Sequence, residues 1–429
     1  MACAMAPSWV WRGKERKIQC RAVAQEQQRK EEKNPKLVTF IGKGGTGKTT
    51  CSVLAAQFYA SIGLRTCLVI QSQDVTADFL LGHQLKHQPT KILENGSLTA
   101  LRLETTKILA QPLEQVKKAD GRISFSQGAL QTEVAGEELS VLPGMDSIMA
   151  LFVLDQLCGF ARRFFPKRSK VFKPEYDVVV YDGPNSDETL RMFGCAERLR
   201  WYMNRFRSIA EKTDIGRVVL PSILRLAEAS LLEDLSTERS TSELWELANT
   251  VLHGVEQNFA NPNTFSSYIV TDPRSKLTEK TALRYWGCAV QAGVHVAGVV
   301  HHQNSRAQTW KEGFSSLAVA SIPELTFGES PPSWEQILSS LDKQTCEVLR
   351  GDGSSVSNPP VSLDHSSGTV TCFLPGFDKA DVKLSQLKRS ELLLDAGDQK
   401  RVIKLPPQMH GKVKGAKFQD KSLIIQMTA

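Results

Sequence analysis

The sequence contains no Cys-x-x-Cys pair and no long uninterrupted apolar run. Its nine cysteines are scattered, which excludes a zinc clasp or a dithiol redox site built on such a pair. Isolated cysteines in a chain of this length fit a reducing compartment, in which most of them serve as small buried apolar residues. No window approaches the roughly eighteen apolar residues that a membrane-spanning helix needs. The longest candidate, residues 148–165, is interrupted by Asp155, Gln156, Arg162 and Arg163.

Outside the N-terminal segment, basic residues barely outnumber acidic ones. The net charge is +7, and residues 1–36 hold nine Lys and Arg against four Asp and Glu, a balance of +5 that leaves +2 for the other 393 residues. This nearly neutral body shows no basic stripe with interleaved aromatic side chains, so the sequence predicts no nucleic-acid binding.

The same N-terminal segment is poor in hydroxyl side chains, with Ser8 alone. It opens Met-Ala, is basic, and carries a single acid, Glu15, before Glu26. These features indicate an organelle-targeting leader with a cleavage region near residues 18–22. Transit peptides are usually rich in serine, however, so a disordered cytosolic leader is the alternative.

A phosphate-loop pattern is the strongest motif that is present. Residues 42–49 read Gly-Lys-Gly-Gly-Thr-Gly-Lys-Thr, between an apolar run at 37–41 that predicts a strand and a segment at 49–59 that predicts a helix. Such a unit aims backbone N–H groups and the positive helix end at one point, which creates an anion site for phosphates. Lys48 is then placed to reach the β- and γ-phosphates, and the Thr49 hydroxyl to hold Mg²⁺.

The predicted nucleotide contacts are Gly42, Lys43, Gly44, Gly45, Thr46, Gly47, Lys48, Thr49 and Thr50. A glycine-rich turn that matches the pattern by chance is the alternative.

Apolar runs alternate with helical patterns over the body of the chain. Strands are expected at 64–70, 176–182, 265–271 and 294–301, and a mostly helical stretch is expected from 75 to about 140. Such an alternation predicts an α/β fold with a doubly wound, mostly parallel sheet and a helical subdomain. Right-handed crossovers then place the phosphate loop at the carboxyl ends of the strands.

Beyond a Gly-, Ser- and Pro-rich linker the apolar residues recur with period two, which predicts a small antiparallel β-sandwich. The predicted divisions are a leader at 1–36, a nucleotide-binding domain at 37–349, a linker at 350–360 and the sandwich at 361–429.

Three further residues are candidates for the chemistry. Asp182 ends an apolar strand and suits the acid that positions Mg²⁺ through water, although an ordinary strand-end Asp is the alternative. Asp74 follows the second strand and could orient the attacking water, or simply cap a helix. Lys43 follows the first glycine and could point outward to a partner subunit, where a donated cation is worth about 10³–10⁵ in rate.

These segments resemble a known family. The stretch Lys43-Gly-Gly-Thr-Gly-Lys-Thr49 is similar to the deviant phosphate loop of a class of dimeric ATPases. Within that class, Asp74 and the segment from Asp182 to Arg191 resemble the two switches of the arsenite-pump (ArsA) and tail-anchored-protein-targeting ATPases. The C-terminal segment resembles the α-crystallin-like domain of some plant and cyanobacterial members, and the whole layout looks like the chloroplast branch.

The resemblance implies a Mg²⁺-dependent homodimer in which Lys43 reaches the nucleotide of the other subunit. ATP binding and hydrolysis would be coupled to binding and release of a hydrophobic client protein or tail-anchored segment, in the chloroplast stroma or alternatively the cytoplasm. The apolar face of residues 190–206, together with residues 148–157, would line a client groove, although plain core is the alternative. His302 stands near the position of an adenine-side Asn.

Departures from the family pattern keep other functions open. Asp74 is followed by Val-Thr-Ala instead of Pro-Ala-His, and the second switch also differs, so hydrolysis could be slow and the chain could be a passive nucleotide-binding chaperone. An anion or metalloid pump subunit is a further alternative, although the pump's cysteines are not matched. Because the Cys-x-x-Cys clasp is absent, a dimer must be held by other contacts.

Overall fold

The computed structural model describes residues 35–104, 145–160, 175–210, 241–302, 313–325, 328–351 and 358–428. The predicted leader and the segment 105–144 lie outside these ranges. An eight-stranded sheet forms the centre, with the order β3-β4-β2-β5-β1-β6-β7-β8. Its strands are β1 (Lys36–Gly42), β2 (Thr66–Ile70), β3 (Thr90–Lys91), β4 (Leu98–Arg102), β5 (Val178–Asp182), β6 (Phe265–Thr271), β7 (Val296–His302) and β8 (Ala318–Ile322).

All neighbouring strands run parallel except β3, which pairs antiparallel with β4. The central strands β2, β5 and β6 are buried at every residue, as expected when helices cover both faces of a parallel sheet. The predicted doubly wound, mostly parallel α/β fold is therefore confirmed.

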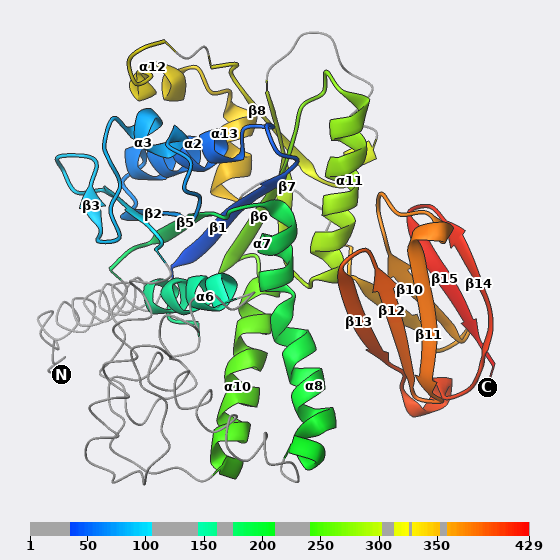
Figure 1. Cartoon of the computed structure of the whole chain (residues 1–429). Helices are drawn as coiled ribbons and strands as arrows, with labels where there is room; N and C mark the ends of the chain where they lie inside the picture. Colours follow the sequence, from blue (N-terminus) through cyan, green and yellow to red (C-terminus); the bar gives the residue numbers. More distant parts are fainter. Residues whose placement is uncertain are drawn as a thin grey trace, which may run out of the picture.

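Two hydrophobic clusters fill the two sides of this sheet. On one side lie α2 (Lys48–Ser61), α3 (Thr76–Leu81), α12 (Trp334–Ser339) and α13 (Lys343–Arg350). On the other side lie α6 (Met145–Cys158), α7 (Ser186–Phe193), α10 (Thr241–Ala260) and α11 (Lys276–Gln291). Helix α8 (Cys195–Ala210) continues from α7, and with α10 it extends away from the sheet as a side-by-side pair (Figure 1).

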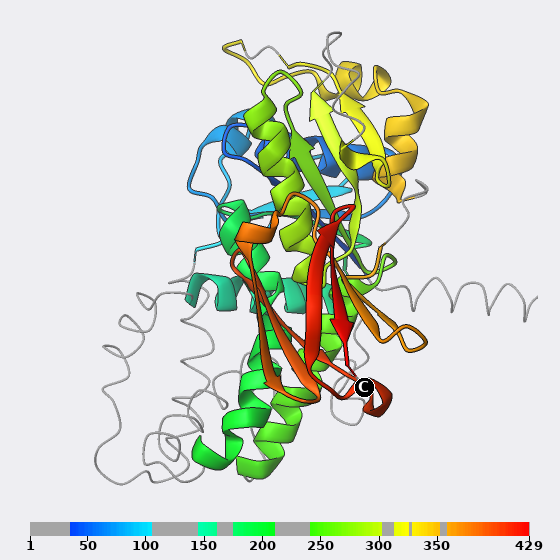
Figure 2. The same cartoon turned by 90° about the vertical axis from the view of Figure 1, so that its right-hand side faces the viewer.

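The C-terminal residues form two antiparallel sheets packed face to face, called here the β-domain (residues 361–427). One sheet has the order β14-β15-β10-β9 and the other β11-β12-β13. Its strands are β9 (Val361–Asp364), β10 (Thr369–Phe373), β11 (Val382–Lys388), β12 (Glu391–Ala396), β13 (Gln399–Lys404), β14 (Val413–Gln419) and β15 (Ser422–Met427). Alternate side chains such as Val370, Cys372, Leu392 and Leu394 form its core, so the predicted antiparallel sandwich is confirmed. Figure 2 shows the β-domain against α11.

The prediction of a mostly helical stretch after residue 75 is wrong for residues 75–104, the part that the structure describes. Only α3 is helical there, and β3 and β4 extend the sheet instead. The five-residue strand β4 ends in Arg102 and lacks β-branched residues except Thr99, so its sequence carries little strand signal. Within the described ranges, no helix is long and apolar enough to span a membrane.

Candidate active site

The phosphate loop connects β1 to α2. Gly45 and Gly47 have φ values of 84° and 86°, a left-handed conformation that side chains with a Cβ rarely adopt. Thr46 closes the loop, because its backbone N–H and its hydroxyl both donate to the Lys43 carbonyl, at 3.2 and 2.7 Å. The first turn of α2 carries no acidic residue and no side-chain cap. Its N–H groups and the positive helix end are therefore left to an anion.

An acid from β5 lies directly behind this loop. The Thr49 hydroxyl donates to Asp182 Oδ2 at 2.8 Å, and the Ser52 hydroxyl donates to Asp182 Oδ1 at 3.1 Å. Asp182 is only 1% exposed, and burial raises its pKa to about 6 against the lowering effect of these hydrogen bonds. Burial lowers the pKa of Lys48, and the negative charge of Asp182 opposes that shift. The structure thus brings Lys48, Thr49 and Asp182 together as predicted, and adds Ser52.

The buried Asp182 gives a prediction about pH. Its pKa is raised from 3.8 to about 6 in the folded chain, so well below pH 3.8 the carboxyl is neutral in both states, and above pH 6 the folded chain holds a desolvated charge. We expect the nucleotide-free protein to lose up to about 3 kcal/mol of unfolding free energy from this group as the pH rises from 4 to 7. Urea unfolding at several pH values will measure it. Asp182→Asn cannot titrate and is the control, so an identical pH dependence of variant and parent would contradict the prediction.

Ser186, which the sequence analysis missed, fixes the start of the loop from α7. The Gly42 N–H donates to Ser186 Oγ at 2.9 Å, and the Ser186 hydroxyl donates back to the Gly42 carbonyl at 2.6 Å. Gly42 is packed so tightly that a Cβ would lie 2.5 Å from the Val270 carbonyl oxygen. The N-terminal turn of α7 and the phosphate loop are therefore joined by two hydrogen bonds.

Asp74 lies just before α3, but the N-cap residue of this helix is Val75, and the helix has no side-chain cap. The Asp74 Oδ1 accepts from the Thr76 N–H at 2.8 Å and from the Thr76 hydroxyl at 2.6 Å. These hydrogen bonds lower the pKa of the exposed Asp74 carboxyl, which keeps it ionised. A role of this carboxylate toward water stays a prediction.

Arg102 at the end of β4 is a second residue that the sequence analysis missed, because it falls in the stretch expected to be helical. It is buried, and its guanidinium donates to the carbonyls of Ser72 and Asp74 and to Asp78 Oδ1, the last at 2.8 Å. Arg102 thereby fixes the backbone on both sides of the loop that carries Asp74.

Replacing Arg102 by Met is expected to lower the unfolding free energy by about 2 kcal/mol. The side chains of Arg102 and Asp78 are 8% and 22% exposed. The change therefore removes the cation from a mostly buried carboxylate, which keeps the Leu85 N–H at 3.2 Å, and removes the Arg102 donors from two carbonyls. Urea unfolding of Arg65→Met is the matched control, because the Arg65–Asp177 pair is 54% and 38% exposed and should contribute less than about 1 kcal/mol. Equal losses in the two variants would contradict the role of Arg102.

Comparison with known proteins agrees with this geometry. A family model described as "Anion-transporting ATPase" matches residues 35–310, more than half of the chain. The chain belongs to the anion-transporting ATPase family. A second model, "HSP20-like domain found in ArsA", matches residues 368–427. The resemblance to the ArsA family, with its additional C-terminal domain, is confirmed.

Several anion-transporting ATPase relatives can be named. The chain is 30% identical over 176 residues to a protein of Chlorobaculum tepidum named as an arsenical pump-driving ATPase, covering 41% of this chain and 39% of that protein. It is 26% identical over 280 residues to one of Aquifex aeolicus, with 62% of each chain covered. It is 26% identical over 162 residues to ATPase ARSA2 of Chlamydomonas reinhardtii, with 38% of each covered. The chain thus spans about two fifths of the length of the first of these curated relatives.

His302 contacts the phosphate loop. Its Nε2 lies 3.1 Å from the Thr46 carbonyl oxygen, and a Cβ on Gly47 would lie 2.5 Å from the same nitrogen. His302 therefore packs behind the loop; its expected position beside an adenine stays a prediction. The neighbouring His301 ring lies against the His302 carbonyl, with Nδ1 at 3.0 Å.

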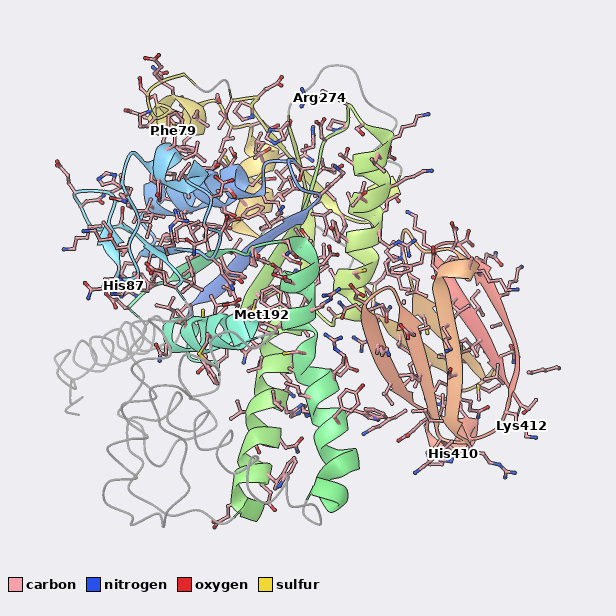
Figure 3. All side chains as sticks on the ribbon, viewed as in Figure 1. Phe79, His87, Met192, Arg274, His410 and Lys412 are labelled. Atoms are coloured by element: carbon pink, nitrogen blue, oxygen red, sulfur yellow. The ribbon has the colours of Figure 1, made fainter. Side chains whose placement is uncertain are left out.

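The remaining candidates lie on or beside the loop. Gly44 and Gly45 are exposed, Lys43 is half-buried, and Thr50 is buried in the first turn of α2. At the same edge of the sheet, Arg274 pairs with Asp272 at 2.8 Å and with Glu324 at 2.9 Å (Figure 3). These ion pairs hold the segment between β6 and α11 and were not predicted from the sequence.

Proposed function

We propose that the chain is a Mg²⁺-dependent ATPase that acts as a homodimer and couples ATP binding and hydrolysis to binding and release of a hydrophobic client protein. The observation that supports the enzymatic part best is the contact between Thr49 and the buried Asp182 beside Lys48. A hydroxyl and a carboxylate at this place fit a hydrated Mg²⁺, whose chemistry would be to neutralise charge on the transferred phosphoryl group.

The residues of the chain have separate tasks in this proposal. The loop N–H groups and Lys48 bind the phosphates, and Thr49 with Asp182 holds the metal. Asp74 orients the attacking water, and Lys43 of the second subunit places a cation beside the γ-phosphate. The HSP20-like match is compatible with a client-binding role.

The client surface is proposed on the projecting helices. The predicted apolar face is core where it belongs to α7, because Leu190 and Phe193 are 1% and 2% exposed, so that part of the groove prediction is wrong. Farther along, Leu199 and Tyr202 on α8 are each 44% exposed. These two side chains are available to an apolar client segment.

Steady-state ATP hydrolysis by the purified chain, with light scattering in the presence and absence of ATP and Mg²⁺, tests the proposal. Hydrolysis of ATP by a dimeric protein supports the proposal. Binding of ATP without hydrolysis would instead indicate a passive nucleotide-binding chaperone. Protection of an apolar tail-anchored segment from aggregation tests client binding separately.

A metalloid-pump subunit is the second candidate, because relatives carry the name arsenical pump-driving ATPase. Against it, the cysteines of the pump are not matched in the sequence, which has none between Cys195 and Cys288. Stimulation of ATP hydrolysis by arsenite would favour this candidate.

We propose that the protein is located in the chloroplast stroma. Import into chloroplasts of a reporter protein fused to residues 1–36 tests this location.

A further inference from the structure

Helix α7 touches the phosphate loop with its first residue and the β-domain with its last turn. Ser186 exchanges two hydrogen bonds with Gly42. Five residues later, Arg191 donates to Asp398 Oδ2 from Nη2 at 2.6 Å and from Nε at 3.2 Å. Asp398 lies in the turn between β12 and β13. A rigid helix of eight residues therefore connects the proposed ATP site directly to the β-domain.

The corner between α7 and α8 reinforces this contact. Arg198 donates to the Asp398 carbonyl at 3.2 Å and to the Arg191 carbonyl at 2.9 Å, so it binds both partners. Gly194 forms the corner itself, and a Cβ there would lie 2.7 Å from Gln399 Oε1. A side chain at this position would displace the Gln399 side chain of β13.

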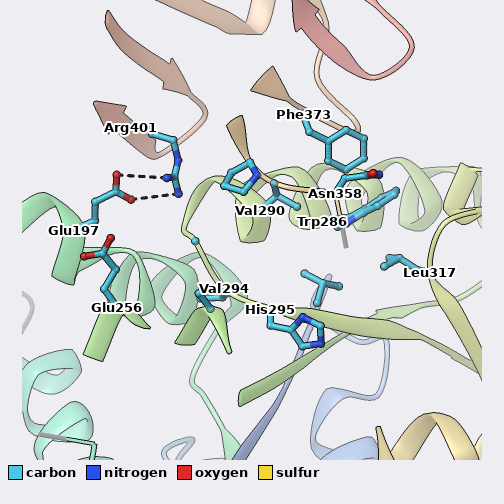
Figure 4. A pocket seen from close by; sticks show the side chains of 14 residues that line it. Glu197, Glu256, Trp286, Val290, Val294, His295, Leu317, Asn358, Phe373 and Arg401 are labelled. Carbon is cyan, nitrogen blue, oxygen red and sulfur yellow. Dashed lines mark hydrogen bonds and ion pairs between the residues drawn. The ribbon is translucent and has the colours of Figure 1, made fainter. Parts of the chain in front are cut away.

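Two residues farther along β13, Arg401 pairs with Glu197 of α8 at 3.2 Å (Figure 4). This pair is well shielded, with exposures of 13% and 25%. Beside it the interface leaves a cavity of about 200 Å³ between the two parts, lined by Trp286, Val290 and Phe373 among others. Apolar packing is therefore incomplete there, and polar contacts hold the register of the β-domain on α7 and α8.

Helix α11 is the second anchor of the β-domain, and it follows β6, the other neighbour of β1. Arg284 pairs with Asp381 at 2.6 Å and stacks on Phe377 with 4.0 Å to the ring centre. The Tyr285 hydroxyl donates to Asp187 of α7 at 3.3 Å. The β-domain thus rests on α7 and α11, which follow the two strands beside β1, and these two helices are joined by the hydrogen bond from Tyr285 to Asp187.

We propose that the β-domain is energetically coupled to the nucleotide site through α7, with Asp398 as a positioning residue that acts through Arg191 on Ser186 and Gly42. The proposal rests on the proposed ATPase function. Ser186 is hydrogen-bonded to both the N–H and the carbonyl of Gly42. When the β-domain fixes the position of α7, Ser186 therefore keeps the phosphate loop in the conformation that binds its ligand. Such coupling is reciprocal. If docking of the β-domain strengthens ATP binding, then bound ATP must strengthen docking of the β-domain by the same factor.

The test measures binding of a fluorescent ATP analogue with Mg²⁺ to the full chain. Asp398→Arg places a cation opposite Arg191 and Arg198, and we expect the Kd to rise about fivefold, the low end of usual coupling. The charge swap Arg191→Asp with Asp398→Arg should recover most of this loss, which a merely destabilised fold would not do. Asp395→Arg is the control, because the Asp395–Lys400 pair lies within the β-domain, and its Kd should match the parent.

Hydrogen exchange gives the reciprocal readout and covers the case in which Asp398→Arg folds poorly. Adding the nucleotide with Mg²⁺ to the parent should slow exchange at residues 396–401, and Arg191→Gln should remove that effect. Equal Kd values for parent and Asp398→Arg, with exchange at 396–401 unchanged by nucleotide, would overturn the coupling alone. A parent chain that binds no ATP analogue would overturn the proposed function as well.

Discussion

Lys48→Met is expected to weaken binding of ATP with Mg²⁺ by about 100-fold or more. The reason is the position of Lys48 in the first turn of α2, beside the buried Asp182, whose negative charge opposes the lowering of the Lys48 pKa by burial. Removing this cation takes away the positive charge that Lys48 would place at the phosphates. A fluorescence titration measures the Kd, and thermal unfolding shows whether the variant is folded.

Lys343→Met is the matched control for this change. Lys343 is also a lysine at the start of a helix, but its side chain is 92% exposed and its partner is Glu347 one turn away. It should bind nucleotide as the parent does. If Lys48→Met retained the parental Kd, the loop would not be the nucleotide site.

Lys43→Ala should reduce ATP hydrolysis by about 1000-fold while ATP binding changes little. Lys43 contributes its carbonyl oxygen to the loop through Thr46, and this contact survives the substitution, so the phosphate cradle stays intact. Its half-buried side chain is proposed to serve the opposite subunit of the dimer. Single-turnover hydrolysis and a separate binding titration distinguish the two effects.

Mixing two inactive variants tests whether Lys43 acts across the dimer. In a mixed dimer of Lys43→Ala and Lys48→Met subunits, one site combines an intact Lys48 with the Lys43 of its partner. When the two variants pair at random in equal amounts, about half of the dimers are mixed, and one of the two sites in each mixed dimer is complete. The mixture should therefore regain about a quarter of the parental activity. If Lys43 acted within its own subunit, each site of the mixed dimer would lack one lysine, and the mixture would stay inactive.

The parts of the site that were predicted are those encoded by local pattern. The loop from Gly42 to Thr49 needs neighbouring residues of fixed type, and a buried strand that ends in an acid identifies Asp182. Ser186 and Arg102 had no such signal, because the pairing of β1 with β5 brings Ser186 to Gly42 across 144 residues. Their roles follow from tertiary neighbours, which a single sequence does not show.

For the fold as well, features encoded by local sequence patterns were predicted, and features that depend on residues far apart in the sequence were not. Period-two patterns predicted the β-domain because each strand repeats its own alternation. Its docking depends on pairs such as Arg191 with Asp398, 207 positions apart, and either residue alone looks like an ordinary exposed charge. Strand β8 was missed because Ala318-Val-Ala-Ser-Ile322 is short and rich in small residues.

The two-residue strand β3 has a consequence for the fate of the chain during synthesis. A parallel sheet exposes unpaired N–H and C=O groups at its outermost strand, where another unfinished chain can pair and start an aggregate. Thr90–Lys91 covers the β4 edge antiparallel, offers few free groups of its own, and carries a charged, exposed lysine. This short strand therefore protects the β4 side of the sheet from edge-to-edge association with other copies.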